Sequence, residues 1–337
     1  MSQWKIGLIG GTGLGAALLA EAQGVRHEID TPFGRPSDAI VQTQWHGLDV
    51  LLLNRHGPGH LLYPSAVPFR ANIFALKQLG CTHIIASGAV GSLRQEFVPR
   101  DLVVPDQVID KTFRRAGTFY EKAAVHVEFA EPFCPVLRQA LIEEGSAEFA
   151  ATAGSPPAGH ASGESPSRAP TVHGRGCYVC MEGPAFSSRA ESLMHRLWGG
   201  DLIGMTAMPE ARLAREAEIP YALLALVTDF DCWRNKPTAP ASQSGAAPTA
   251  PPADPAILLE EIMANLRAAT DNATRLIRRT LRRLAADTGP LESCPARSAL
   301  KLAIWSDKSR VDPEEIRRLG PLWGRYFEDS AHVTTGS

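Results

Sequence analysis

The sequence has no hydrophobic run of membrane-spanning length and no excess of charge of one sign. None of its apolar runs approaches the ~18 residues that a membrane helix needs. Its 34 lysines and arginines nearly balance 36 aspartates and glutamates, leaving a formal net charge of −2. Because proteins that hold nucleic acid through bulk charge are strongly basic, this balance argues against such a partner. We therefore expect neither a membrane nor a nucleic acid as a partner.

Cysteine is scarce and scattered. Only Cys177 and Cys180 form a CxxC pair, and no second pair exists to complete a zinc site. The pair falls in an apolar run that is typical of a strand, where residues three apart point to opposite faces. We interpret these residues as two structural thiols and predict no metal site. Scattered thiols and a start without a signal-peptide pattern favour a cytoplasmic protein.

Proline is the one residue type in excess, and the excess is local. Of 26 prolines, ten lie in segments 146–171 and 235–256. Both segments have too few apolar residues to offset the entropy lost on ordering, so we predict two flexible insertions. A PxxP motif from Pro237 to Pro240 leaves a scaffold that binds partner domains as an alternative. The Ala-, Ser- and Gly-rich composition fits a linker better.

Short, continuous apolar runs alternate with helical patterns along the chain. Continuous runs suit strands buried on both faces, and their alternation with helices predicts an α/β fold around a parallel or mixed sheet. A long helix is predicted over 258–284, with one apolar face and an arginine-rich face that we interpret as solvated. The expected strands are 6–9, 50–53, 83–87, 102–104, 177–181, 202–205 and 221–228, and the expected helices are 68–79, 134–144, 188–198 and 209–218. The arginines of the long helix are Arg275, Arg278, Arg279, Arg282 and Arg283.

A glycine-rich loop, Gly10–Gly15, directly follows the first predicted strand. Glycines let the backbone approach a phosphate, whose oxygens accept N–H bonds at the start of the next helix. The loop also matches a loose dinucleotide fingerprint, with Asp30 roughly 20 residues further on. Asp30, however, precedes Thr-Pro-Phe-Gly rather than ending a strand. A nicotinamide-dinucleotide enzyme is therefore a distant alternative.

Three further polar motifs follow predicted strands. Arg55 and His56 open a Gly-rich turn, and arginine presents a fixed fork suited to phosphate. The small residues of 87–92 would let a flat ring approach the backbone. Asp229 and Asp231 end a strand that is expected to be buried, where two carboxylates are costly unless they have a function. Together these motifs indicate a site for an anion and a planar ring.

Seven motifs in order give the chain a resemblance to a known family. They are GGTGLG, RHGPGHLLYPSAVPFRANIFAL, SGAVGSLR, AEPFCP, EGPAFSSRAES, GMTAMPEARLARE and TDFDCW. The chain resembles the nucleoside phosphorylase superfamily, in its trimeric purine nucleoside phosphorylase branch, and is most similar to the methylthioadenosine phosphorylases. The resemblance covers roughly residues 4–145, 172–234 and much of the C-terminal part.

The resemblance implies a three-layer α/β fold with a central mixed, partly barrel-like sheet flanked by helices. It implies one phosphorylase domain over 1–290, a C-terminal extension over 291–337 packed on it, and a homotrimer. The implied reaction is reversible phosphorolysis of S-methyl-5′-thioadenosine to adenine and 5-methylthioribose 1-phosphate, in methionine and purine salvage. Inorganic phosphate is then a co-substrate and no cofactor is needed. A broader purine nucleoside phosphorylase acting on adenosine or inosine is the nearest alternative.

The resemblance also assigns site residues. Ser187 would lie beside the sugar or base as a specificity residue, and His126 would reach the 5′ end of the substrate in a neighbouring subunit. The implied phosphate ligands are Thr12, Arg55, His56, Gly88, Ala89 and Thr206. The other implied substrate contacts are Phe186, Val90, Gly91, Ile203, Met205, Phe230, Asp229 and Asp231.

The two carboxylates bear on the choice of purine. Relatives that take 6-oxopurines carry Asn where this chain has Asp229. An ionised carboxylate only accepts hydrogen bonds, which suits the exocyclic amine of a 6-aminopurine. Asp229 is also the candidate general acid for N7 of the leaving base, which requires a raised pKa. Burial and the neighbouring Asp231 would raise it.

Four departures from the family pattern stand out. Gly88 occupies a position where many relatives place a hydroxyl residue on the phosphate, and Ala185 occupies a usual arginine position. The insertion at 146–171 joins a helix to a strand and is expected to decorate the surface. Segment 235–256 replaces the region that closes over the 5′ substituent, so we predict mobility there that matters for closure.

Overall fold

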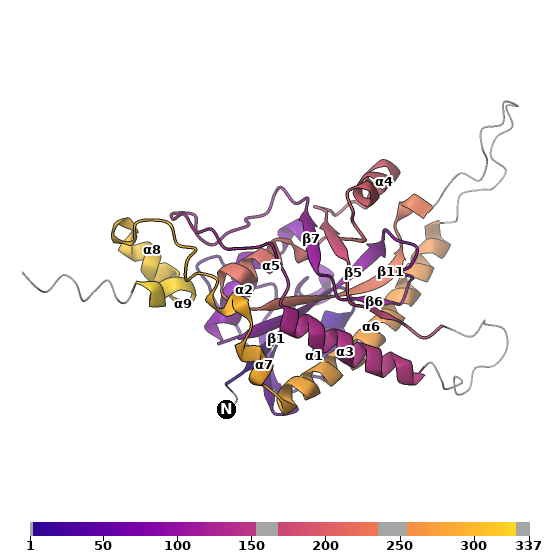
Figure 1. Ribbon diagram of the computed structural model, residues 1–337, viewed down its shortest axis with the longest axis horizontal. Coiled ribbons are helices and arrows are strands. Elements are labelled where there is room, and N and C mark those ends of the chain that lie inside the picture. The colour runs from indigo at the N-terminus through magenta and orange to yellow at the C-terminus, as the bar shows by residue number, and fades with distance from the viewer. Residues whose placement is uncertain (1–2, 153–167, 235–254, 328–337) are drawn as a thin grey trace, which may run out of the picture.

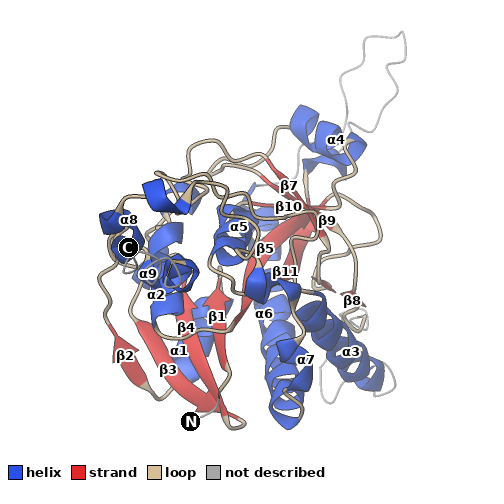
Figure 2. Cartoon of the chain, turned by 60° about the vertical axis from the view of Figure 1, so that its left-hand side comes forward, coloured by secondary structure: helices blue, strands red, loops and turns tan. Residues whose placement is uncertain are grey.

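The computed structural model describes residues 3–152, 168–234 and 255–327, which form helices on both faces of one mixed sheet (Figures 1 and 2). The described strands are β1 (Lys5–Gly10), β2 (Val25–His27), β3 (Ile40–Trp45), β4 (Leu48–Asn54), β5 (His83–Ser92), β6 (Leu102–Val103), β7 (Gln107–Asp110), β8 (Val172–His173), β9 (Cys177–Cys180), β10 (Leu202–Gly204) and β11 (Tyr221–Phe230). The described helices are α1 (Leu14–Glu21), α2 (Phe69–Gln78), α3 (Pro135–Thr152), α4 (Arg189–Leu197), α5 (Ala207–Glu216), α6 (Pro255–Ala286), α7 (Gly289–Glu292), α8 (Pro313–Arg318) and α9 (Gly320–Trp323).

The sheet runs in the order β2-β3-β4-β1-β5-β10-β9-β7 and branches at β5. The first part of β5 pairs in parallel with β1, whereas its last residues pair antiparallel with β10. β11 pairs in parallel with almost all of β5. It also pairs antiparallel with β6, which in turn pairs in parallel with β8. This change of partners along one strand gives the predicted mixed, partly barrel-like sheet.

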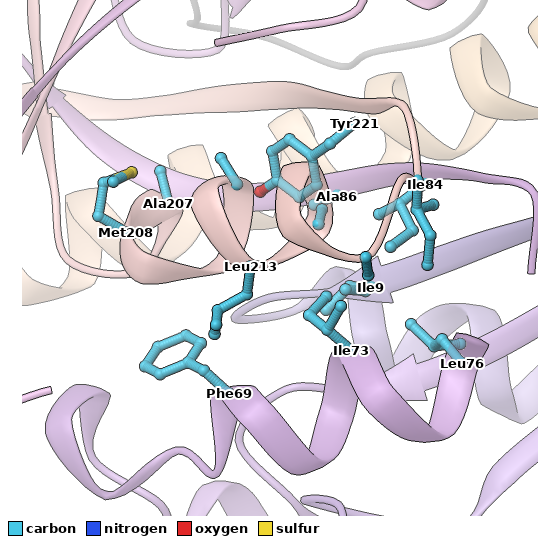
Figure 3. Close-up of a cluster of buried hydrophobic side chains, with 14 of the residues drawn as sticks. Ile9, Phe69, Ile73, Leu76, Ile84, Ala86, Ala207, Met208, Leu213 and Tyr221 are labelled. Atoms are coloured by element: carbon cyan, nitrogen blue, oxygen red, sulfur yellow. The ribbon is translucent and has the colours of Figure 1, made fainter. Parts of the chain in front are cut away.

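Alternate residues of the central strands face opposite helical layers, as the pleat requires. Ile9 and Ile84 face the layer of α2 and α5, whereas Leu8 and Ile85 face that of α1, α3 and α6. Figure 3 shows Phe69 and Ile73 of α2 directed toward α5, with Ile9 beside them. Because both faces are covered, the strands are apolar throughout, and the predicted three-layer α/β fold is confirmed.

The arginine-rich face of α6 is less solvated than predicted. α6 lies beside α3, and the two helices face each other with complementary charges (Figure 1). Arg279 lies 2.9 Å from Glu144 and 3.3 Å from Glu148, while Arg283 contacts Glu143 and Glu144. The two arginine side chains are 39% and 42% exposed, so each pair contributes at most about 1 kcal/mol.

The first predicted insertion begins later than expected. Residues 146–152 continue α3 rather than starting a flexible segment, and Phe149 is buried in the core between α3 and α6. Burial of this ring and the ion pairs of Glu148 extend the helix beyond the point that composition suggested. Residues 153–167 lie outside the described residues. The same holds for 235–254, including Pro237 and Pro240, while residues 255–256 already belong to α6.

The C-terminal part begins on the α1, α3 and α6 face, with Leu291, Cys294 and Ala296, and from Leu300 onward packs on the α2 and α5 face. Leu300, Leu319 and Trp323 are fully buried in the same core cluster as Ile73 and Phe74 of α2. Trp323 also stacks on Tyr120, with ring centroids 4.8 Å apart. Burying side chains of this size stabilises the packing by about 1.5–3 kcal/mol each.

Candidate active site

The candidate site forms where the parallel strands β1, β4, β5 and β11 have their carboxyl ends. Ligands of open α/β sheets commonly bind at this edge, because loops leave the strands there. We call the part around Thr12, Arg55, His56, Gly88 and Thr206 the phosphate end. We call the part around Gly91, Ile203, Asp229 and Asp231 the purine end.

Arg55 is the centre of the phosphate end and is completely buried. Its Nε and Nη2 atoms each donate to Glu210 at 2.7 Å, in a bidentate pair, and Nη1 donates to the Ser87 carbonyl at 2.6 Å. The Tyr221 hydroxyl donates to Glu210 at 2.9 Å. Burial alone would lower the pKa of Arg55, but the Glu210 carboxylate outweighs it and raises the pKa. The guanidinium is therefore a fixed positive charge.

His56 lies beside Arg55 as a neutral ring. Its Nδ1 donates to the Leu62 carbonyl at 2.7 Å, and the ring stacks on His60. Burial and the adjacent Arg55 charge lower the pKa of His56 to about 4, although the bond to Leu62 opposes the shift. In the neutral tautomer Nε2 is then the acceptor.

The glycine-rich loop meets Arg55 and the middle of β5. The Gly11 N–H donates to the Ser87 hydroxyl at 3.1 Å. A Cβ at Gly11 would lie 2.8 Å from Nη1 of Arg55, and one at Gly88 would meet only Thr206 Oγ1, at 3.6 Å. Gly11, Arg55, Gly88 and Thr206 are thus brought together, with space at Gly88 where many relatives are expected to carry a hydroxyl.

The other predicted phosphate residues lie close by in sequence and structure. Thr12 is half-buried in the turn before α1, and Ala89 is half-buried in β5. The neighbouring Gly13 has φ +83°, and a Cβ there would lie 2.8 Å from Thr270 Oγ1 of α6. α6 therefore packs directly over the loop, and only glycine fits at this turn.

The purine end is built from the ends of β5, β10 and β11. A Cβ at Gly91 would lie 3.2 Å from Asp229 Oδ1, 3.2 Å from Ile203 and 3.4 Å from Asp231. A register shift between Val227 and Asp229 marks a bulge there. Bulges re-aim side chains, and this one directs Asp229 toward Gly91.

Asp229 has the environment that a general acid needs. Burial is the main cause that raises its pKa and the nearby Asp231 carboxylate adds to it, although a 2.6 Å hydrogen bond from the Thr228 hydroxyl opposes the shift. Asp231 is buried, and its Oδ2 has no hydrogen-bond partner among the described residues. A raised pKa and an unpaired buried acceptor are unusual for purely structural residues.

Met205 lies in the chain between Ile203 of the purine end and Thr206 of the phosphate end. A Cβ at Gly183, where φ is +66°, would come within 2.5 Å of the Met205 sulfur. The Thr206 N–H donates to the Tyr178 hydroxyl at 3.4 Å. The close contact at Gly183 is possible only without a side chain, so the Met205 side chain is held against the loop that follows β9.

Four predicted contacts lie at the margin of the site or outside it. Phe186 is 84% exposed, and Ser187 is half-buried with its carbonyl accepting from the Cys232 thiol. Phe230 packs edge-on against Trp233, with ring centroids 6.1 Å apart. His126 is exposed and packs on Trp305. Their roles remain predictions, as does that of Val90, whose side chain is buried in the core.

Sequence reasoning missed Glu210 and Arg115. Glu210 lies in α5, where Arg215 and Glu216 are buried as well, and its pairing with Arg55 spans 155 positions. Arg115 donates to the carbonyls of Met205 and Met208 at 2.6 Å. The sequence signal for Arg115 was a pair of adjacent arginines, at 114 and 115. Such a pair does not show which of the two side chains is buried.

The chain is similar to known proteins over nearly its whole length. The model of the family described as "Phosphorylase superfamily" matches residues 5–282. The chain belongs to the phosphorylase superfamily. S-methyl-5′-thioadenosine phosphorylase of Synechocystis sp. is 43% identical over 96% of this chain and 87% of its own length. The Xenopus tropicalis protein of the same name is 44% identical over 68% of this chain and 77% of its own.

Solved structures of this superfamily have the same fold as the chain. The crystal structure of a methylthioadenosine phosphorylase from an Antarctic soil metagenomic library has a TM-score of 0.77 and 39% sequence identity. It covers 95% of this chain and 98% of the other. A Schistosoma mansoni methylthioadenosine phosphorylase in complex with tubercidin has a TM-score of 0.73 and 34% identity, over 90% and 99% of the two chains.

Two negative findings apply to the part of this phosphorylase that the structure describes. No three histidine, cysteine, aspartate or glutamate side chains lie together in a way that could hold a metal ion. No helix among these residues is long and apolar enough to cross a bilayer. Cys177 and Cys180 lie on β9 as free thiols, and Cys180 accepts a hydrogen bond from the Met208 N–H, which agrees with structural thiols.

Proposed function

We propose that this chain catalyses the phosphorolysis of S-methyl-5′-thioadenosine to adenine and 5-methylthioribose 1-phosphate. One observation carries the proposal: a buried Arg55 and a carboxylate with a raised pKa, Asp229, lie at the same edge of one sheet. Relatives about 40% identical over nearly the whole chain, and neighbouring structures, are named for this substrate. The active site thus has an anion-binding group at its phosphate end and a proton donor at its purine end.

At the phosphate end, Arg55 supplies the positive charge for inorganic phosphate. The backbone of Gly88 and Ala89, with the hydroxyls of Thr12 and Thr206, supplies donors. Neutral His56 supplies an acceptor at Nε2 for a phosphate oxygen that carries a proton. A phosphate held here lies next to the ribose and stabilises the positive charge that develops as the glycosidic bond loosens. Phosphate is consumed as a co-substrate, and the reaction as proposed needs no cofactor.

At the purine end, protonated Asp229 donates to N7 as the base leaves, and Asp231 accepts from the exocyclic amine. Burial raises the pKa of Asp229 and so favours the protonated form that donation requires. A 6-oxopurine would present a carbonyl oxygen to the Asp231 carboxylate. Both groups only accept hydrogen bonds, so both would lack a donor. A mismatch of this kind can cost ~10⁴-fold in discrimination.

The direct test is phosphate-dependent release of base from three nucleosides. We expect adenine release from S-methyl-5′-thioadenosine to require phosphate, with 5-methylthioribose 1-phosphate as the second product. Adenosine should react more slowly and inosine by far the slowest. Base release without phosphate, or faster turnover of inosine, would reject the proposed reaction or its 6-aminopurine preference.

We also propose that the enzyme is a cytoplasmic homotrimer with one phosphorylase domain over 1–290 and an extension over 291–337. Several large apolar side chains are exposed in the single chain, and six free thiols suit a reducing compartment. The exposed apolar side chains include Leu61, Phe113, Phe186, Leu302 and Trp305. Light scattering should give three times the 36.3 kDa chain mass, and a monomer would contradict the assembly.

A further inference from the structure

Arg115 lies in the segment between β7 and α3, and its side chain is only 2% exposed. A guanidinium carries five N–H donors, and each of them is used here. Nη1 donates to the carbonyls of Met205 and Met208, both at 2.6 Å. Nη2 donates to the carbonyls of Glu182 at 2.6 Å and Met181 at 3.5 Å, and Nε donates to the Glu182 carboxylate at 3.1 Å. One side chain thus ties the 181–182 and 205–208 segments to each other and to its own segment.

The segments that Arg115 joins carry the residues between the two ends of the site. Met205 and Thr206 follow β10, and Glu182 follows β9 just before the loop whose Gly183 touches the Met205 sulfur. Four of the five bonds go to backbone carbonyls, so they fix the path of the chain as well as neutralising charge. Displacing the Met205 carbonyl would move both the Met205 side chain and the Thr206 hydroxyl.

Glu182 keeps this clamp charged and fixed. Burial raises its pKa, but bonds from Ser65, from the N–H groups of Phe113 and Arg114, and the Arg115 charge outweigh burial and lower it to about 2. The carboxylate is therefore ionised throughout the physiological range. Since Phe113 and Arg114 directly precede Arg115, Glu182 also holds the segment from which the guanidinium extends.

We propose that Arg115 is a positioning residue for both substrates, because it fixes Met205 against the ribose and Thr206 against the phosphate. This inference rests on the proposed function. Arg115 touches neither substrate and acts through the backbone of the 205–208 segment. A lysine cannot replace it, because one ammonium group cannot reach four carbonyls on two segments with the geometry of a planar fork.

The test compares Arg115→Met and Arg115→Lys with the control Arg138→Met. Arg138 of α3 also donates to two backbone carbonyls, those of Pro105 at 2.9 Å and Gly174 at 2.6 Å, but it does not contact the 205–208 segment. Kinetics are measured with S-methyl-5′-thioadenosine and phosphate, at a temperature where circular dichroism shows every variant folded.

We expect Arg115→Met to lose at least 100-fold in kcat/KM and to raise the KM for phosphate at least 10-fold, with Arg115→Lys in between. Arg138→Met should stay within threefold of the wild type, even where its melting temperature falls equally. A merely structural role would lower the active fraction, and hence kcat, without changing KM. An unchanged phosphate KM in Arg115→Met, or equal losses in Arg138→Met, would overturn the proposal.

If Arg115→Met does not fold, Arg115→Lys decides: a 10-fold loss in kcat/KM supports the proposal, and a loss under threefold overturns it. Failure of the proposed function gives a different result, namely no adenine release by the wild type. Inorganic phosphate is then the probe. A phosphate-induced rise in melting temperature that is lost in Arg115→Lys but kept in Arg138→Met supports the positioning role, and a rise kept in all variants rejects it.

Discussion

The phosphate end and the purine end of the site differ in how completely their buried polar atoms are paired. At the phosphate end, Arg55, Glu210, Tyr221 and Ser87 form one closed set of hydrogen bonds, and the buried atom without a partner there, among the residues that the structure describes, is Thr270 Oγ1 of α6, above the glycine-rich loop. At the purine end, the buried Asp231 Oδ2 lacks a hydrogen-bond partner within the described part of the chain, and so do both ring nitrogens of His195, on the α4 helix that packs against residues 232–234. The first end is prearranged for a ligand that never varies. The second keeps unmet bonding capacity, which suits an end completed by its substrate.

Breaking the buried pair at the phosphate end should have the largest effect. Arg55→Met leaves Glu210 as an uncompensated buried charge, which costs about 3–5 kcal/mol of unfolding free energy. It also removes the cation for phosphate, so we expect phosphorolysis to fall at least ~10³-fold. Urea denaturation and steady-state kinetics measure the two losses.

The double variant Arg55→Met/Glu210→Leu separates structure from binding. Replacing both members of a buried ion pair by apolar residues is often neutral for stability. We therefore expect most of the unfolding free energy to return while activity stays lost. Recovery of activity in the double variant would show that Arg55 supports the fold without holding phosphate.

At the purine end, Asp229→Asn should mainly affect the chemistry. The amide can donate a hydrogen bond but cannot transfer a proton to N7, and general acids contribute typically ~10²–10⁴-fold. We expect kcat/KM for S-methyl-5′-thioadenosine to fall in that range, and the ratio of inosine to adenosine turnover to rise. Unchanged turnover of the adenine nucleosides would remove Asp229 as the general acid.

The two ends should also make opposite contributions to stability as pH changes. The folded state lowers the pKa of His56 from 6.5 to about 4, so the unfolded chain binds the extra proton between these values. His56 therefore adds stability as pH rises from about 4 to 6.5, by roughly 3 kcal/mol at most. The pKa of Asp229 is raised from 3.8, so its contribution falls as pH rises above 3.8 through the folded value.

Denaturation curves of the wild type, His56→Gln and Asp229→Asn across pH 3.5–7.5 test these slopes. The difference between wild type and His56→Gln should grow with pH, and that between wild type and Asp229→Asn should shrink. Slopes of the same sign for both differences would contradict the assigned protonation states.

The sequence predicted the central strands because their apolar runs are continuous, as in β1, β4, β5 and β11. It missed β3, whose alternation of Val41 and Thr43 with glutamines is weaker as a signal. The tight turn from β3 to β4 uses positive φ angles at His46 and Gly47. The composition of residues 146–152 wrongly predicted a flexible segment. These residues are helical because Phe149 is buried against α6, and composition does not contain such a tertiary contact.

The sequence predicted those site residues that belong to motifs at the ends of strands. Thr12, Arg55, Gly88 and Asp229 converge because parallel strands place their carboxyl ends at one edge. The bonds that hold them come from residues distant in sequence. Glu210 and Arg115 act through burial and through carbonyl acceptors, and nothing in their local sequence specifies either.

The smallest expected effect is at His195, and it tests the comparison most directly. His195 is 3% exposed, and neither ring nitrogen has a hydrogen-bond partner among the described residues. Replacing an unpaired buried polar group with an apolar one of similar shape is nearly neutral or stabilising. We expect His195→Phe to change the unfolding free energy by less than about 1 kcal/mol, and the ring contact with Trp198 is kept.

His83 offers the matched control, because it is also buried and also packs edge-on against a tryptophan, Trp4. Its nitrogens, however, are bonded to the Thr82 hydroxyl at 3.1 Å and to the Leu291 carbonyl at 3.2 Å. His83→Phe removes the ring nitrogen that bonds the Leu291 carbonyl, while the Thr82 hydroxyl keeps its bonds to the Lys5 backbone. We expect a cost of about 1–3 kcal/mol in urea denaturation. If His195→Phe costs as much, His195 has a partner in the folded protein, and its ring no longer counts toward the contrast between the two ends.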